Sequence, residues 1–210
     1  MFSADQAMEW IRRTAAVIDE HAVMLTRLDS AIGDGDHGAN MTRGFRAVLE
    51  RVDGLQEKDL ASLFRTVGMA LIGKVGGAAG PLYGSLYLAM GKQLGAAGEA
   101  GDGELAAALR AGYDGVVARG KAQPGDKTML DAWYPALEAL DRAVDGGAQL
   151  GAALDQAAAA AEEGMKATIP LVARKGRASY LGERSRDHQD PGATSSYLLV
   201  RALADTVNGR

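Results

Sequence analysis

The stretch LDSAIGDGDHGANMTRGF, residues 28–45, stands between two segments with helical periodicity and is dense in charge and glycine. Its three carboxylates, Asp29, Asp34 and Asp36, lie so close in sequence that they repel one another unless something neutralises them. A divalent cation removes this conflict, since hard cations such as Mg²⁺ prefer carboxylate oxygens. The glycines between them let the backbone turn sharply enough to aim the carboxylates at one point. The stretch therefore predicts a Mg²⁺ site, in a loop between helices, that receives a phosphorylated ligand.

Other interpretations of this loop are weaker. It could be a capped turn, in which Asp36 caps the following helix while the other two aspartates are solvated. A calcium loop is excluded, because the position of its bidentate glutamate is held by Phe45. Residues 33–38, GDGDHG, match the dinucleotide fingerprint, but a helix precedes them and their aspartates would repel a bare pyrophosphate.

Composition excludes several classes of protein. The 210 residues suffice for one well-buried domain, expected to span residues 1–210. A net charge of −4 argues against a protein that binds nucleic acid through bulk electrostatics. With no cysteine there is no disulfide and no thiolate chemistry. The sequence begins without a signal-peptide pattern and contains no apolar run of about 20 residues, the length that spans a bilayer. We expect a soluble, cytoplasmic protein without a membrane partner.

Helical periodicity recurs along the chain, whereas sustained β-type alternation is absent. Ser3 with Gln6, Asp102, Asp126, and Asp190 followed by Pro191 have the character of helix starts. The pattern predicts an all-α domain of eight helices, over residues 3–28, 39–52, 59–75, 84–96, 103–117, 126–144, 149–167 and 190–207.

The unusual loops follow alternate helices of this series: the acidic loop, 75–84, 119–126 and 168–190. In an up-down arrangement such loops fall at the same end of a bundle. We therefore expect the four loops to surround one site.

Two of these loops suit a phosphorylated ligand. Residues 75–84, VGGAAGPLYG, would offer free backbone N–H groups at a helix start, although a tight helix–helix turn explains the glycines equally well. Residues 168–190 are locally basic, which is usual for a solvated loop but would also let one arginine neutralise phosphate charge. His37 would contact a phosphate or fix the loop. Met129 and Leu130 would line an adenine pocket or simply belong to the core.

Four longer motifs together carry a resemblance that covers the chain. They are LDSAIGDGDHGANMTRGF at 28–45, VGGAAGPLYG at 75–84, RGKAQPGDKTM at 119–129 and RKGRASYLGERSRDHQDPGATS at 174–195. In order and spacing the chain resembles the nucleotide-binding L subunits of dihydroxyacetone kinase, of the bacterial phosphotransferase-dependent type. The resemblance implies a closed barrel of eight antiparallel helices with the nucleotide at one end.

The resemblance also assigns residues. Asp29, Asp34 and Asp36 match the carboxylates that hold two Mg²⁺ ions against the phosphates of ADP or ATP. Arg177 and His37 are the expected catalytic residues. The positions expected to contact the nucleotide are His37, Gly38, Ala39, Asn40, Gly77, Ala78, Ala79, Gly120, Thr128, Met129, Arg177, Asp190, Pro191 and Gly192.

The implied reaction involves two partner subunits. Tightly held ADP is phosphorylated by a phosphohistidine of an M subunit, and the ATP formed passes its γ-phosphate to dihydroxyacetone on a K subunit. An alternative is the L subunit of a dihydroxyacetone or tetrose kinase that exchanges ATP freely. A second alternative is a nucleotide-dependent binding protein that reports to a transcriptional regulator, without contacting nucleic acid directly.

One position departs from the family pattern. Many relatives carry Ser or Thr where this chain has Ala79, so a hydroxyl contact to phosphate is missing. Because backbone N–H contacts remain, we expect a modest loss of nucleotide affinity rather than inactivity.

Overall fold

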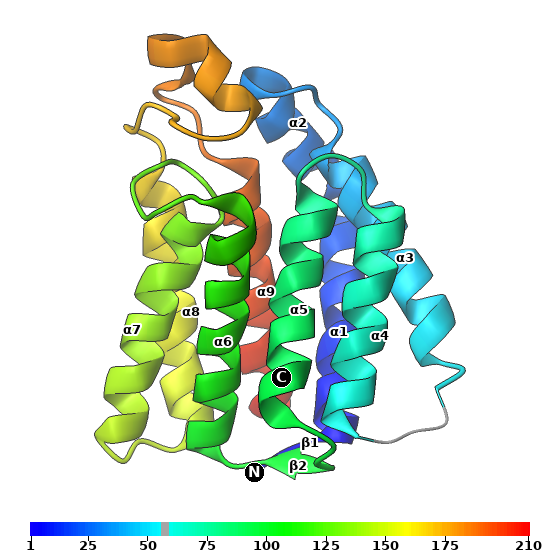
Figure 1. Ribbon diagram of the computed structural model, residues 1–210. Coiled ribbons are helices and arrows are strands. Elements are labelled where there is room, and N and C mark those ends of the chain that lie inside the picture. Colours follow the sequence, from blue (N-terminus) through cyan, green and yellow to red (C-terminus); the bar gives the residue numbers. More distant parts are fainter. Residues whose placement is uncertain (56–58) are drawn as a thin grey trace.

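The computed structural model describes residues 1–55 and 59–210, which are predominantly helical (Figure 1). This confirms the all-α class. Nine α-helices and one 3₁₀ helix, η1, occur in the described residues: α1 (Ala4–Glu20), α2 (Ala22–Ile32), α3 (His37–Val52), α4 (Leu60–Lys74), α5 (Ala79–Leu94), α6 (Asp102–Gly120), α7 (Leu130–Asp145), α8 (Leu150–Ala167), η1 (Arg177–Ser185) and α9 (Pro191–Val207).

The predicted first helix, 3–28, is wrong in extent, because it is interrupted at His21. This residue has φ −95° and ψ 7°, so its ψ lies far from the helical value. Its ring Nδ1 lies 2.9 Å from the Val17 carbonyl, the same oxygen that accepts the His21 backbone N–H. The break leaves α2 as a separate helix that carries the chain into the acidic loop.

Helix starts test the predicted caps. Ser3 and Gln6 form the predicted capping box, with Gln6 N donating to Ser3 Oγ at 3.2 Å. Asp190 is also confirmed as a cap, since its Oδ2 accepts the Ala193 N–H at 2.7 Å and Pro191 opens α9. Asp102 is not a cap: it lies inside α6, whose first turn is closed by Glu104.

Asp126 does not cap α7 either, because that helix begins only at Leu130. Its carboxylate instead accepts the Gln123 N–H at 2.9 Å and so shapes the preceding loop. The sequence also predicted no strand, whereas β1 (Phe2–Ser3) pairs antiparallel with β2 (Glu99–Ala100). Two-residue strands are too short to show alternation along a sequence.

Buried aromatic side chains hold the helices together. The Trp10 ring lies 5.6 Å from that of Tyr87 and 6.0 Å from that of Phe64, so α1, α4 and α5 meet at one cluster. Trp10 Nε1 also donates to the Leu199 carbonyl of α9 at 3.0 Å. Since large aromatics bury much apolar area and the indole N–H is satisfied, this cluster fixes four helices relative to one another.

The loops predicted to meet do so. The acidic loop, the turn before α5, the loop after α6 and the segment around η1 lie at the same end of the molecule, and residues of all four line one cavity (Figure 1). The two short strands lie at the opposite end. Among the described residues, no helix combines the length and apolar character required to cross a membrane.

Candidate functional site

The cavity at the loop end has a volume of about 440 Å³, which is within the range of small-molecule sites. Most of the residues predicted to contact a nucleotide line it, namely His37, Asn40, Gly77, Ala78, Ala79, Gly120, Thr128, Met129, Arg177, Asp190 and Gly192. Gly38, Ala39 and Pro191 are not among the lining residues. Gly38 packs against α2 instead, where an added Cβ would collide with the Ala22 carbonyl.

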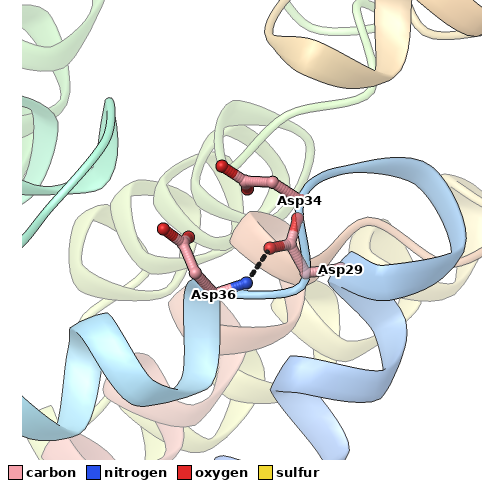
Figure 2. Close-up of side chains that lie close together, drawn as sticks. All are labelled: Asp29, Asp34 and Asp36. Atoms are coloured by element: carbon pink, nitrogen blue, oxygen red, sulfur yellow. Dashed lines mark hydrogen bonds between the residues drawn. The ribbon is translucent and has the colours of Figure 1, made fainter.

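Figure 2 shows the three aspartates of the acidic loop converging on one point. Each offers a carboxylate oxygen, and these oxygens all lie within 4.8 Å of one another. Asp29 comes from the last turn of α2, Asp34 from the loop and Asp36 from the residue before α3. The sequence prediction that the three would gather is therefore confirmed in their geometry.

Asp29 organises the loop. Its Oδ2 accepts the backbone N–H groups of Asp36 at 2.8 Å and His37 at 3.1 Å, which leaves its other oxygen available. Gly33 is required beside it, because a Cβ there would collide with the Asp29 carboxylate. Gly35 adopts φ +72°, a left-handed conformation that glycine takes without strain.

The capped-turn interpretation does not fit Asp36. Although it occupies the N-cap position of α3, its side chain makes no capping hydrogen bond. No hydrogen bond or ion pair of its carboxylate occurs among residues 1–55 and 59–210. The Asp34 carboxylate pairs with Arg177, whose Nε lies 3.0 Å from Oδ2. An all-oxygen set, in which Asp36 is unpaired among the described residues and Asp29 and Asp34 each use one oxygen, fits a hard cation such as Mg²⁺.

The turn before α5 faces this triad across the cavity. Ala78 is the N-cap of α5 and provides no side-chain cap, so the first N–H groups of the helix have no intrahelical partner. Gly77 has φ +63°. Arg43 connects the start of α3 to the end of α4. Its Nη2 donates to Asn40 Oδ1 at 2.5 Å and its Nε to the Lys74 carbonyl at 3.0 Å.

Four helices, α3, α5, α7 and α9, begin at this end of the molecule (Figure 1). The N-cap residues of the first three make no capping bond with their own side chains, whereas Asp190 caps α9. At α3 the Asp29 carboxylate accepts the His37 N–H instead, and at α7 the Thr128 hydroxyl accepts the Leu130 N–H. Each helix start carries a partial positive charge from the aligned peptide dipoles. The cavity therefore combines the carboxylate triad with the start of α5, a helix end that lacks a side-chain cap and has the character of an anion site.

The loop between α6 and α7 is held by two buried charged groups that sequence reasoning missed. Lys127 is 1% exposed and donates to the carbonyls of Thr168 at 2.8 Å and Leu171 at 3.0 Å. The Asp131 carboxylate accepts the N–H groups of Gly125 at 2.5 Å and Thr128 at 2.7 Å. The sequence does not indicate these roles, because the partners of Lys127 and Asp131 are backbone groups that reach them only when the loop folds back.

Burial shifts the ionisation of groups around the cavity. It lowers the pKa of Lys127 and raises the pKa of Asp190 to about 7, although the Ala193 N–H and the Lys127 charge oppose the shift at Asp190. Burial also lowers the pKa of His37, against the attraction of Asp29 and Asp36. Met129 is 4% exposed and forms an apolar wall with Leu130, Leu82 and Val116.

The chain has clear relatives. A family model described as the DAK2 domain matches residues 31–205. The chain is 43% identical over 202 residues to the PEP-dependent dihydroxyacetone kinase, ADP-binding subunit DhaL, of Escherichia coli (strain K12), with 96% of each chain covered. It is 42% identical over 207 residues to the PTS-dependent dihydroxyacetone kinase, ADP-binding subunit DhaL, of Lactococcus lactis subsp. lactis (strain IL1403), covering 99% of this chain and 100% of that one.

A solved structure has the same fold. The crystal structure of the dihydroxyacetone kinase from C. freundii in complex with AMP-PNP and Mg²⁺ superposes with a TM-score of 0.71 at 30% sequence identity. The match covers 93% of this chain and 33% of that one, so the chain spans about a third of the C. freundii enzyme. Since the family model matches most of the sequence and the DhaL subunits align over nearly all of it, the chain belongs to the DAK2 domain family.

Proposed function

We propose that this chain is the nucleotide-carrying subunit of a dihydroxyacetone kinase. In this proposal a phosphohistidine on an M subunit passes its phosphoryl group to bound ADP. The ATP formed then donates its γ-phosphate to dihydroxyacetone on a K subunit, which regenerates ADP. The observation that carries the proposal is the carboxylate triad facing the uncapped start of α5 across one cavity.

Mg²⁺ would be held by Asp29, Asp34 and Asp36. Two ions suit three carboxylates better than one, because a single divalent cation leaves a net negative charge facing the phosphates. Bound there, Mg²⁺ would neutralise phosphate charge and fix the phosphate oxygens during transfer. Asp29 keeps one oxygen for this role while the other fixes the loop backbone.

The phosphates would lie between the metal loop and the turn before α5. The N–H groups of Gly77, Ala78 and Ala79 would bind their oxygens, since the backbone there is uncapped. Asn40 lies beside this turn, since a Cβ added to Gly76 would be 3.0 Å from its Oδ1. We assign the charge-neutralising role at the γ-phosphate to Arg177, which would leave Asp34 when the cation binds.

The nucleoside would occupy the apolar part of the cavity. Met129 and Leu82 provide surfaces that suit a base, and the two glycines Gly120 and Gly192 leave room beside them. A Cβ on Gly192 would lie 3.1 Å from the Asp190 carboxylate and fill the edge of this space. The chain needs no substrate pocket for the acceptor, because dihydroxyacetone would be bound by the K subunit.

The barrel expected from the family resemblance also remains a proposal. Helix packing supports it: α1 packs on α3, each helix from α3 to α9 packs on the next, and α9 packs back on α1. Such a ring contains eight helices and leaves α2 outside, at the loop end. The expected cytoplasmic location and the contact with a transcriptional regulator stay predictions.

The identity of the bound nucleotide tests the function directly. The purified protein would be desalted and then denatured, and the released nucleotide identified by chromatography and mass spectrometry. We expect ADP close to one per chain, and its loss when the folded protein is washed with EDTA. Absence of ADP, together with no binding of added ADP and Mg²⁺ in calorimetry, would overturn the proposal.

A second candidate is a kinase subunit that exchanges ATP freely. It is favoured by the likeness to the longer C. freundii kinase, which was solved with AMP-PNP and Mg²⁺. The desalting step separates the two candidates. ADP that survives repeated desalting supports a resident cofactor recharged by the M subunit, whereas rapid loss supports exchange from solution.

A further inference from the structure

Three buried hydroxyl groups connect His37 to the body of the fold. Tyr83 lies in the second turn of α5 and is 1% exposed, while Ser195 and Ser196 lie in α9 and are 0% exposed. Ser195 Oγ lies 2.9 Å from His37 Nε2 and 2.7 Å from the Tyr83 hydroxyl. Ser196 Oγ lies 2.9 Å from the Tyr83 hydroxyl. The series of contacts therefore joins the acidic loop to α5 and α9.

We assign the direction of these hydrogen bonds from the buried end of the series. In the part of the chain that the structure describes, Ser196 Oγ has only the Tyr83 hydroxyl as a partner. Either oxygen could donate, but only donation from Ser196 gives the Ser196 hydrogen an acceptor, and we adopt that direction. Tyr83 then donates its own hydrogen, and Ser195 Oγ at 2.7 Å is nearer than the backbone carbonyl at 3.2 Å.

The last step reaches the imidazole. Ser195 has one hydrogen and three possible acceptors: His37 Nε2 at 2.9 Å and the carbonyls of Pro191 at 3.1 Å and Gly192 at 3.2 Å. We take the shortest contact, to Nε2, as the one that receives the hydrogen. A neutral imidazole carries its hydrogen on one ring nitrogen only. If Nε2 accepts from Ser195, the hydrogen lies on Nδ1.

The free ring nitrogen matters because His37 lines the cavity beside the carboxylate triad. Among the described residues, Nδ1 of His37 has no hydrogen-bond partner. A phosphate oxygen accepts hydrogen bonds and is repelled by a bare nitrogen lone pair. Only the tautomer with hydrogen on Nδ1 presents a donor to a phosphorylated ligand.

We propose that Ser195, supported by Tyr83, is a positioning residue that holds His37 in the Nδ1–H tautomer, so that the ring donates to a phosphate of the bound nucleotide. The inference rests on the proposed function for the identity of the ligand. The hydroxyl groups themselves act only through His37. Replacing Ser195 by alanine removes the donor to Nε2 and frees the ring to take the other tautomer.

Nitrogen NMR tests the tautomer in the protein without ligand. The chain has three histidines, so long-range ¹H–¹⁵N spectra of protein labelled at histidine are simple to assign. At a pH where the ring is neutral we expect Nδ1 of His37 to be protonated, and Ser195→Ala to move the hydrogen toward Nε2. Protonated Nε2 in the unmodified protein would overturn the proposal. A purely structural role of Ser195 would leave the tautomer unchanged.

Binding of ADP in the presence of Mg²⁺ tests the consequence. Ser195→Ala should weaken binding about tenfold, the loss expected for one hydrogen bond to a charged group. Ser85→Ala is the matched control, since Ser85 donates to its own helix carbonyl at 2.8 Å and does not contact His37. In a His37→Leu background Ser195→Ala should have no further effect on affinity.

The outcomes separate the two proposals. Failure of the unmodified protein to bind ADP would overturn the proposed function, while the tautomer measurement would still stand. Binding that is equal in the unmodified protein and Ser195→Ala would overturn the role of Ser195 alone. Should Ser195→Ala not fold, Tyr83→Phe keeps the ring volume and removes the donor to Ser195. Because the Ser195 hydroxyl remains but loses the contact that orients it, the tautomer should shift in the same direction by a smaller amount, and an unshifted ring would overturn the supporting role of Tyr83.

Discussion

Arg177 and Asp34 form an ion pair, with Nε 3.0 Å from Oδ2, although 67% of the arginine side chain is exposed to solvent. An exposed pair of this kind contributes at most about 1 kcal/mol. A divalent cation binding to Asp34 would therefore displace the guanidinium at little cost. The ion pair would therefore couple metal binding to the release of an arginine beside the proposed phosphate site.

Replacing Arg177 should separate its competition with Mg²⁺ for Asp34 from its role in phosphoryl transfer. Arg177→Ala removes the competitor for Asp34, so binding of Mg²⁺ to the nucleotide-free protein should strengthen, by about two- to fivefold for an exposed pair. Phosphoryl transfer should fall by about a thousandfold, because an arginine that stabilises transition-state charge is lost. Calorimetry measures the first effect and transfer from ATP to dihydroxyacetone, with the K subunit present, measures the second. Weaker Mg²⁺ binding in the variant would contradict the competition.

Neutralising one carboxylate of the triad should release the nucleotide. We expect Asp36→Asn and Asp34→Asn to abolish retention of ADP that depends on Mg²⁺, because a hard cation loses an anionic ligand. The helical circular dichroism spectrum should be unchanged, since neither side chain supports a helix through a capping bond. Asp145→Asn, an exposed position at the end of α7 away from the cavity, serves as the control. Retention at the level of the unmodified protein in Asp36→Asn would remove that residue from the metal site.

The gathering of the four loops was predictable from helix order alone. Alternate connections of antiparallel helices lie at one end, and this holds even though the predicted first helix is two helices. The Asp190 and Ser3 caps were also predictable, because capping acts within a few residues. Sequence patterns did not predict contacts between residues that are far apart in the chain. The hydroxyl of Tyr83 meets Ser195 across 112 positions, and no local pattern encodes that contact.

The start of α7 shows the same limit in one loop. Asp126 has the character of an N-cap, but the chain places its carbonyl against the Arg174 N–H and begins the helix four residues later. Lys127 takes φ +63° and a buried position, which is unusual for a lysine, and its ammonium group is held by carbonyls beyond α8. Such a loop is determined by its partner segment, which sequence periodicity does not identify.

Ala79 is the position at which the family resemblance leads us to expect a serine or threonine hydroxyl. Restoring it with Ala79→Ser should strengthen ADP binding by about three- to tenfold, the contribution of one added hydrogen bond, without affecting the backbone donors of the same turn. The residue is the first of α5, where serine is tolerated. Titration of both proteins with ADP at fixed Mg²⁺ measures the change. Equal affinities would show that the backbone N–H groups suffice.

Asp190 should make stability depend on pH. Burial raises its pKa from 3.8 to about 7 in the folded protein, so between these values the folded state binds a proton that the unfolded state has lost. Stability should therefore fall as pH rises from about 4 to 7 and change little above that. Asp190→Asn keeps an oxygen that can cap α9 and cannot ionise. Urea denaturation at pH 5 and pH 8 should show the unmodified protein losing more than about 1 kcal/mol relative to this variant. Parallel pH profiles of the two proteins would mean that Asp190 is already charged at pH 5.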